Sequence, residues 1–258
     1  MKETINLKNK NIIVMGALGR LGKVVSSQLV DKGANVIAVD LDQHLLDKER
    51  SSIDPSKYLP LSGSSNELSS IQKIFKASED EFGKVDGAIN LSYPKNKNFG
   101  NHFFEVSYED FCENVSIHLG AYFLFMQQCA KYSIDNEIKF SLINFSSIYG
   151  VISPKFDIYK DTNMTLPVEY AAIKSSLIHL TSYLTAYTKG SFFRVNSIAP
   201  GGILDDQDSK FLKNYRENSR SKGMLDPEDI LGTVLFLLSD ASEFVCGQNI
   251  IVDDAFTI

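Results

Sequence analysis

Short apolar runs alternate with longer segments of helical spacing along almost the whole chain. The apolar runs predict strands at 11–15, 35–39, 57–61, up to 89–90, 140–145, 192–198 and 249–252. The helical spacing predicts helices at 21–32, 40–50, 66–82, 107–132, 165–189 and 226–238. Since strands joined by such helices pair in parallel through right-handed crossovers, the pattern predicts an α/β fold, a doubly wound parallel sheet of about seven strands with helices on both faces.

No linker, repeat or change of composition divides the 258 residues, of which 43% are hydrophobic. We therefore expect residues 1–258 to form a single domain. In a sheet of this kind ligands bind beyond the carboxyl ends of the strands. Three segments there, at about 93–101, 149–166 and 202–222, are the expected substrate loops.

Charge and cysteine content exclude several classes of function. A net charge of -6 and a pI near 5.3 argue against nucleic acid or an anionic membrane as a partner. No run approaches the roughly 18 apolar residues of a membrane span, and no apolar signal segment follows the N-terminus. Three scattered cysteines without a metal-binding cluster predict reduced thiols, no metal and a cytoplasmic protein.

A glycine turn follows the first predicted strand and opens the first helix. Backbone amides at such a turn can hold a pyrophosphate, which predicts a dinucleotide site of the Rossmann type at Gly16, Gly19, Arg20, Leu21 and Gly22. Asp40 ends the second strand, where a carboxylate accepts from ribose hydroxyls and repels a 2′-phosphate, so NAD is expected rather than NADP. Arg20 argues the other way, because a guanidinium attracts phosphate. A glycine turn that serves packing alone is the alternative.

Tyr170 and Lys174 lie four residues apart in one predicted helix and so share a face. A neighbouring cation favours phenolate, so we expect Lys174 to lower the pKa of Tyr170 towards the range useful for proton transfer. Tyr93 and Lys97 have the same spacing, but Pro94 makes that segment a loop, in which the argument does not hold.

These features, in this order, resemble the short-chain dehydrogenase/reductase family over nearly the whole chain. Further shared features are Asn90 after the fourth strand, Ser147 in Asn-Phe-Ser-Ser, and Asn196-x-x-x-Pro-Gly. The resemblance implies that Tyr170 is the general acid/base, that Lys174 lowers its pKa and holds the nicotinamide ribose, and that Ser147 orients the substrate oxygen. It also implies that Asn90 holds the loop near the adenosine and the ribose. The nicotinamide would be lined by Pro200, Gly201 and Ile203.

Several positions depart from the family pattern. His118 stands where the family usually has the asparagine that supports a proton-relay water. It could hold that water or carry the proton itself, or it could be a histidine satisfied within a packing face. Asp205 replaces a threonine that often contacts the cofactor amide, and Asp253-Asp254-Ala255 lacks the customary glycine pair.

The 23 positions from Ser147 to Tyr170 exceed the usual separation by about ten, which predicts an insertion that shapes the substrate pocket. Lysines in this insertion and in the loop at 93–101 hint at an anionic substrate, although loop lysines are usually only solvated. The Tyr-Pro-Lys loop, the insertion, His118-Leu-Gly and the Val-Asp-Asp ending resemble the flagellin-modification dehydrogenases of bacterial nonulosonic acid synthesis. That resemblance implies an amino-sugar derivative, such as a sugar phosphate or nucleotide sugar.

The sequence thus predicts an oxidoreductase that moves a hydride between NAD(H) and a secondary alcohol or ketone on a small-molecule substrate. One alternative is a sugar epimerase or lyase that oxidises its substrate transiently with tightly held NAD. A second is an NAD-binding partner protein without turnover. By resemblance, the long helices at 107–132 and 165–189 would form a homodimer or homotetramer.

Overall fold

A single parallel sheet of seven strands forms the centre of the computed structural model, which describes residues 5–258. The strand order is β3-β2-β1-β4-β5-β6-β7, so the order reverses between β1 and β4. The strands are β1 (Asn11–Met15), β2 (Asn35–Asp40), β3 (Tyr58–Ser62), β4 (Gly87–Asn90), β5 (Phe140–Phe145), β6 (Phe193–Pro200) and β7 (Asn249–Val252). The predicted fold class is confirmed.

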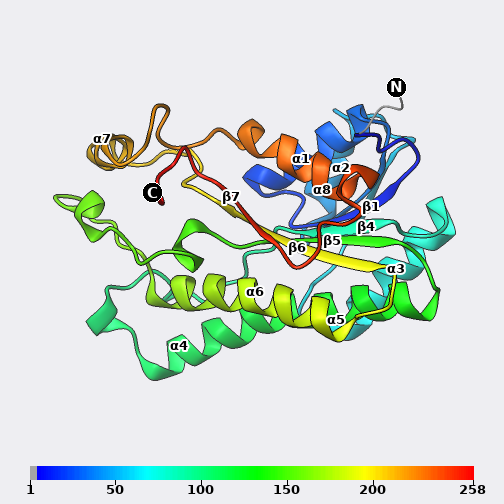
Figure 1. Cartoon of the computed structure of the whole chain (residues 1–258), viewed down its shortest axis with the longest axis horizontal. Coiled ribbons are helices and arrows are strands. Elements are labelled where there is room, and N and C mark those ends of the chain that lie inside the picture. Colours follow the sequence, from blue (N-terminus) through cyan, green and yellow to red (C-terminus); the bar gives the residue numbers. More distant parts are fainter. Residues whose placement is uncertain (1–4) are drawn as a thin grey trace.

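Helices cover both faces of this sheet (Figure 1). The helices are α1 (Arg20–Asp31), α2 (Gln43–Arg50), α3 (Leu68–Phe82), α4 (Tyr108–Asn114), α5 (Gly120–Asp135), α6 (Val168–Tyr187), α7 (Ser209–Glu217) and α8 (Leu231–Leu238). One apolar core joins α1, α2 and α8 to the sheet, and a second joins α3, α5 and α6 to its other face. Two cores explain why the inner strands read as continuous apolar runs.

The edge strand β3 contains Pro60, which has no amide proton to donate. It is tolerated because β3 pairs only with β2, in the register Ala38 to Pro60. The opposite edge is β7, which pairs with β6 from Ser197–Asn249 to Pro200–Val252. These pairings bring the carboxyl ends of β1, β4, β5 and β6 to one side of the molecule.

The helix predicted at 107–132 is not uniform. It consists of α4, a π-helical turn at Val115–Leu119 and α5, and the π turn contains His118. Such turns insert a residue into the helical ladder and are frequent at functional sites. The helix α7 was not predicted at all. Its first turn is capped by the Asp208 side chain, which accepts from the amides of Lys210 and Phe211.

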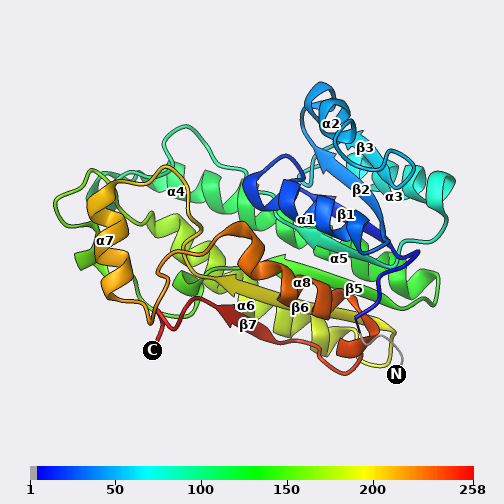
Figure 2. The ribbon, with the colours of Figure 1, turned by 90° about the horizontal axis from the view of Figure 1, so that it is seen from above.

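Figure 2 shows α7 projecting beyond the carboxyl ends of the strands, with the C-terminus of the chain beside it. Both therefore lie on the side of the molecule where ligands bind in sheets of this kind. No helix in the described part of the chain is long and apolar enough to cross a membrane.

Candidate active site

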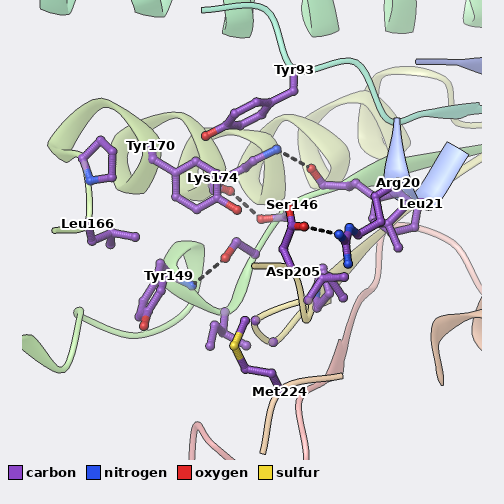
Figure 3. Close-up of a pocket in the computed structure, with 18 of the residues that line it drawn as sticks. Arg20, Leu21, Tyr93, Ser146, Tyr149, Leu166, Tyr170, Lys174, Asp205 and Met224 are labelled. Atoms are coloured by element: carbon purple, nitrogen blue, oxygen red, sulfur yellow. Dashed lines mark hydrogen bonds and ion pairs between the residues drawn. The ribbon is translucent and has the colours of Figure 1, made fainter. Parts of the chain in front are cut away.

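A cavity of about 510 Å³ lies beyond the carboxyl ends of the central strands. One end is formed by the glycine turn and the other by aromatic and apolar residues of the insertion and of the segment around α7 (Figure 3). The predicted residues that line it are Gly16, Gly19, Arg20, Leu21, Gly22, Ser147, Tyr170, Lys174, Pro200, Gly201 and Ile203. The chain therefore brings most of the predicted site together.

The glycine turn has the tight shape that a dinucleotide needs. A Cβ atom on Gly22 would lie 2.1 Å from the carbonyl oxygen of Gly16, so only glycine allows α1 to start this close to the turn. Asp40 is tied to the same turn, because its carboxylate accepts from the amide of Leu18 at 2.9 Å and from that of Leu41 at 2.8 Å. Each oxygen retains capacity to accept from a ribose hydroxyl. The residues fit a dinucleotide.

Arg20 points across the cavity rather than towards Asp40. Its guanidinium donates to the backbone oxygen of Leu204 and forms an ion pair with Asp205 (Figure 3). The side chain is thus engaged on the nicotinamide side of the expected site. The argument that Arg20 would welcome a 2′-phosphate beside Asp40 is not supported by this position.

The catalytic candidates meet where β5 and α6 approach each other. Lys174 Nζ donates to the backbone oxygen of Phe145 at 2.8 Å and lies 5.5 Å from the centre of the Tyr170 ring. Ser147 caps the short turn Ile148–Gly150, which packs against α6. A Cβ atom on Gly150 would lie 2.6 Å from the backbone of Lys174, so glycine permits this approach.

Burial dominates the electrostatics of this group. It lowers the pKa of Lys174 to about 7, and it raises the pKa of Tyr170, while the Ser147 hydroxyl acts in the opposite direction on the phenol. The expected fall in the pKa of Tyr170 towards neutral pH is therefore not found for the protein alone, because removal of the phenol from water dominates. Tyr170 is held as a phenol, the form that can donate a proton to a carbonyl oxygen.

His118 lies behind this group, fully buried on the π-helical turn. The centre of its ring lies 5.0 Å from that of the Tyr93 ring, which it meets edge-on, and 5.6 Å from that of the Tyr122 ring, to which it is tilted. Neither ring nitrogen has a hydrogen-bond partner among the described residues, so no protein group of this packing face satisfies the imidazole. Burial, together with the charge of Lys174, lowers the pKa of His118 to about 3, which keeps the ring neutral.

Three predicted residues do not line the cavity: Asp40, Asn90 and His118. Asn90 is fully buried, and its side-chain oxygen accepts from the amide and the hydroxyl of Ser92. It therefore shapes the loop that borders the glycine turn. Asn196 joins β6 to the segment before β7, since it donates to the Val245 carbonyl and accepts from the Gln248 amide.

The sequence predicted that the loop at 93–101 faces the site, but it did not single out Tyr93 as a site residue. The segment is a loop, as predicted, but the Tyr93 ring lies 5.9 Å from the ring of Tyr170 and forms part of the cavity wall. Its position three residues after β4 was the available signal.

Buried Glu169 was also missed; it accepts from Asn114 at 3.3 Å, and Asn114 in turn accepts from the amide of Asn96. This chain of contacts fixes the loop on α4.

The loop lysines do not face the cavity. Lys155 donates to the backbone oxygen of Phe256, and Lys95 lies over the rings of Tyr93 and Phe99. Arg20, Lys174 and Asp205 are the charged residues among those that line the cavity. A phosphate on the substrate would therefore meet loop lysines only outside the cavity.

Comparison with known proteins agrees with this geometry. The model of the enoyl-(acyl carrier protein) reductase family matches residues 16–257. The post-translational flagellin modification protein A of Campylobacter coli is 38% identical, over 97% of this chain and 99% of that protein. A 3-oxoacyl-[acyl-carrier-protein] reductase of Thermotoga maritima is 27% identical, over 98% of this chain and 100% of that protein.

Among solved structures, a short-chain dehydrogenase from Leptospira borgpetersenii with bound NAD+ superimposes with a TM-score of 0.86. It is 30% identical, and the match covers 100% of this chain and 96% of that one. The chain belongs to the short-chain dehydrogenase/reductase family. It is an NAD(P)-dependent oxidoreductase of that family.

Proposed function

We propose that this protein is an NAD-dependent dehydrogenase that interconverts a secondary alcohol and a ketone on a sugar. The observation that carries the proposal is the convergence of Ser147, Tyr170 and Lys174 at a cavity whose other end is the glycine turn. Shared fold alone would not license this chemistry, whereas a proton donor beside a dinucleotide cleft does. The three free cysteines fit a protein of the cytoplasm, where NAD is available.

NAD is the proposed cofactor. Asp40 is anchored beside the turn by two backbone amides, in the position to accept from ribose hydroxyls and to repel a 2′-phosphate. Arg20, which could offset that repulsion, is paired with Asp205 instead. The relative from Leptospira, which binds NAD+, supports the same choice.

The reaction follows from the protonation states. When bound, the nicotinamide supplies or accepts the hydride. In reduction, Tyr170 donates its proton to the carbonyl oxygen, which Ser147 orients by a hydrogen bond. In oxidation, Tyr170 takes the hydroxyl proton, and the charged form of Lys174 stabilises the phenolate that forms. Both the neutral and the charged form of Lys174 are populated near neutral pH, because burial lowers its pKa to about 7.

His118 serves this proton transfer by holding water. A neutral imidazole offers one donor and one acceptor, and buried polar atoms without a protein partner bind ordered water. With its pKa lowered to about 3, the ring binds a proton too weakly to act as the carrier. Of the two roles suggested by the sequence, support for a relay water is the one we propose.

The proposed substrate is an amino-sugar phosphate or nucleotide sugar used in a bacterial surface glycan, as the flagellin-modification relative suggests. Tyr149, Tyr159 and Met164 provide apolar surface at the substrate end, on which a sugar ring can stack. Because the loop lysines lie outside the cavity, a phosphate or nucleotide would extend towards its mouth.

The test is a panel of neutral, phosphorylated and nucleotide-linked amino sugars, monitored for NADH. Tyr170→Phe should lower turnover by roughly 10²-fold to 10⁴-fold, since proton transfer is lost, and should leave NAD affinity within about twofold. Tyr108→Phe, on the exposed start of α4, is the matched control and should leave turnover unchanged. Near-normal turnover by Tyr170→Phe would refute the assignment. Product formation without net NADH would favour the epimerase or lyase. If no member of the panel is converted, the alternative of a partner protein without turnover would be favoured.

We also propose a homodimer formed through α5 and α6. The outward faces of these helices carry four exposed side chains, Phe123, Ile134, Tyr183 and Tyr187, around a mainly apolar hollow. Exposed aromatic residues grouped in this way are typical of protein–protein interfaces.

A further inference from the structure

The last six residues of the chain, 253–258, follow β7 and lie beside α7 (Figure 2). Two of them have left-handed backbone conformations without being glycine: Asp254 has φ +50° and Ala255 has φ +61°. A residue with a Cβ atom adopts this region at a cost, so neighbouring contacts must hold it there. The contacts of Asp254 supply the reason.

The Asp254 carboxylate binds the loop that follows α7. One oxygen accepts from the amides of Ser221, Lys222 and Gly223 at 2.9, 2.6 and 2.9 Å, and the other accepts from the Ser221 hydroxyl at 2.8 Å. The Asp254 backbone oxygen accepts from the amide of Arg220 at 2.8 Å. These bonds lower the pKa of Asp254, so the group stays charged at physiological pH. Glycine in its place could not form the carboxylate bonds.

This loop leads directly into the cavity wall. Met224 lines the cavity, and Leu225 exchanges backbone hydrogen bonds with the segment after β6, donating to Gly202 and accepting from Leu204 at 2.8 Å each. The carboxylate of Asp254 therefore fixes the chain within one residue of a substrate-facing side chain.

Phe256 connects the same six residues to the insertion at 149–166 and to α7. Its ring is fully buried and stacks on Tyr215 of α7 at 4.3 Å, and its edge faces Tyr149 of the insertion at 6.4 Å. Tyr215 in turn accepts from the amide of Gly202 at 2.7 Å. The Phe256 backbone oxygen accepts from Lys155 Nζ at 2.7 Å. Tyr149 and Tyr215 are both part of the cavity wall.

We propose that residues 253–258 form a latch that holds the insertion at 149–166 and the segment around α7 at 202–224 in one arrangement and thereby sets the shape of the substrate pocket. Asp254 and Phe256 are its positioning residues, and neither touches the reacting atoms. The effect on substrate rests on the proposed function, since it requires that this end of the cavity bind the sugar. The mechanical part, that the latch orders the loops, does not.

The mechanical part is tested by hydrogen–deuterium exchange of the full-length protein. Asp254→Gly relieves the left-handed backbone but removes the carboxylate, so amides at 219–224 should exchange roughly tenfold faster while the sheet is unchanged. Asp254→Asn keeps one acceptor oxygen, so its exchange rate at 219–224 should lie between that of Asp254→Gly and that of the natural protein. Asp240→Asn, which removes an ion pair with Lys10, should leave 219–224 unchanged.

Unchanged exchange at 219–224 in Asp254→Gly, or faster exchange throughout the sheet, would overturn the latch. If Asp254→Gly does not fold, Asp254→Asn decides alone: faster exchange confined to 219–224 supports the latch, and exchange equal to that of the natural protein overturns it.

The second part is measured with whichever amino sugar the natural protein oxidises in the panel. Asp254→Gly should raise KM roughly tenfold while kcat and NAD affinity stay within about twofold, because loop order affects the substrate and not the proton transfer. A parallel loss of kcat and NAD affinity with unchanged KM would refute a positioning role. If no panel member is oxidised, the proposed function fails, and the exchange experiment still decides the latch.

Discussion

Lys174 gives the most quantitative prediction about this protein. Its side chain is 4% exposed, and its ammonium group has one hydrogen bond, to the backbone oxygen of Phe145. The aromatic rings of Tyr122 and Tyr170 lie 5.3 and 5.5 Å away. Burial lowers the pKa of Lys174 from 10.5 to about 7 in the folded protein. Replacing Lys174 by Met, an unbranched apolar side chain of similar length, removes this titration.

The sign follows from proton binding in the two states. Between pH 7 and pH 10 the unfolded chain holds a proton on Lys174 that the folded chain has released, so the free energy of unfolding rises with pH. The slope rises to about 1.4 kcal/mol per pH unit above pH 7, where Lys174 of the folded protein is half deprotonated, and the gain between pH 7 and pH 9 amounts to about 2 kcal/mol. Below pH 7 both states are protonated, and the contribution becomes constant.

The assay is urea unfolding followed by circular dichroism at pH 7, 8 and 9, on protein freed of cofactor. The free energy of unfolding of the natural protein should gain about 2 kcal/mol over this range relative to Lys174→Met. For Lys131→Met, which removes an exposed ion pair with Asp135 on α5, the free energy of unfolding should change with pH as it does for the natural protein. Parallel profiles for the natural protein and Lys174→Met would show that Lys174 is not a buried amine of low pKa.

Three further predictions concern the cofactor, the relay and assembly. His118→Asn should retain turnover within about tenfold, because an amide also offers a donor and an acceptor, whereas His118→Leu should lose roughly 10²-fold or more in kcat. Asp40→Asn should strengthen NADP binding roughly tenfold in calorimetry, because the charge that repels a 2′-phosphate is gone. Tyr187→Glu should convert the proposed dimer to monomer in light scattering, because a carboxylate would be buried at the interface.

The sequence by itself determined the architecture and the order of the functional segments. The strand and helix patterns are local, so periodicity alone indicated seven parallel strands. The relative positions of the glycines at 16, 19 and 22 are fixed within one turn of the chain. Those of Tyr170 and Lys174 are fixed within one helical face, because the two residues are four positions apart. Such short-range relations can be read without knowing what packs against them.

Only the tertiary structure decided which distant residues complete the site. The Tyr93 ring meets the Tyr170 ring edge-on, Arg20 pairs with Asp205, and Asp254 binds amides more than thirty positions earlier in the chain. The pKa of Lys174 likewise depends on its depth within the assembled protein and not on its neighbours in sequence. Side-chain partners and burial depend on which loops share the edge of the sheet, and no local pattern specifies that.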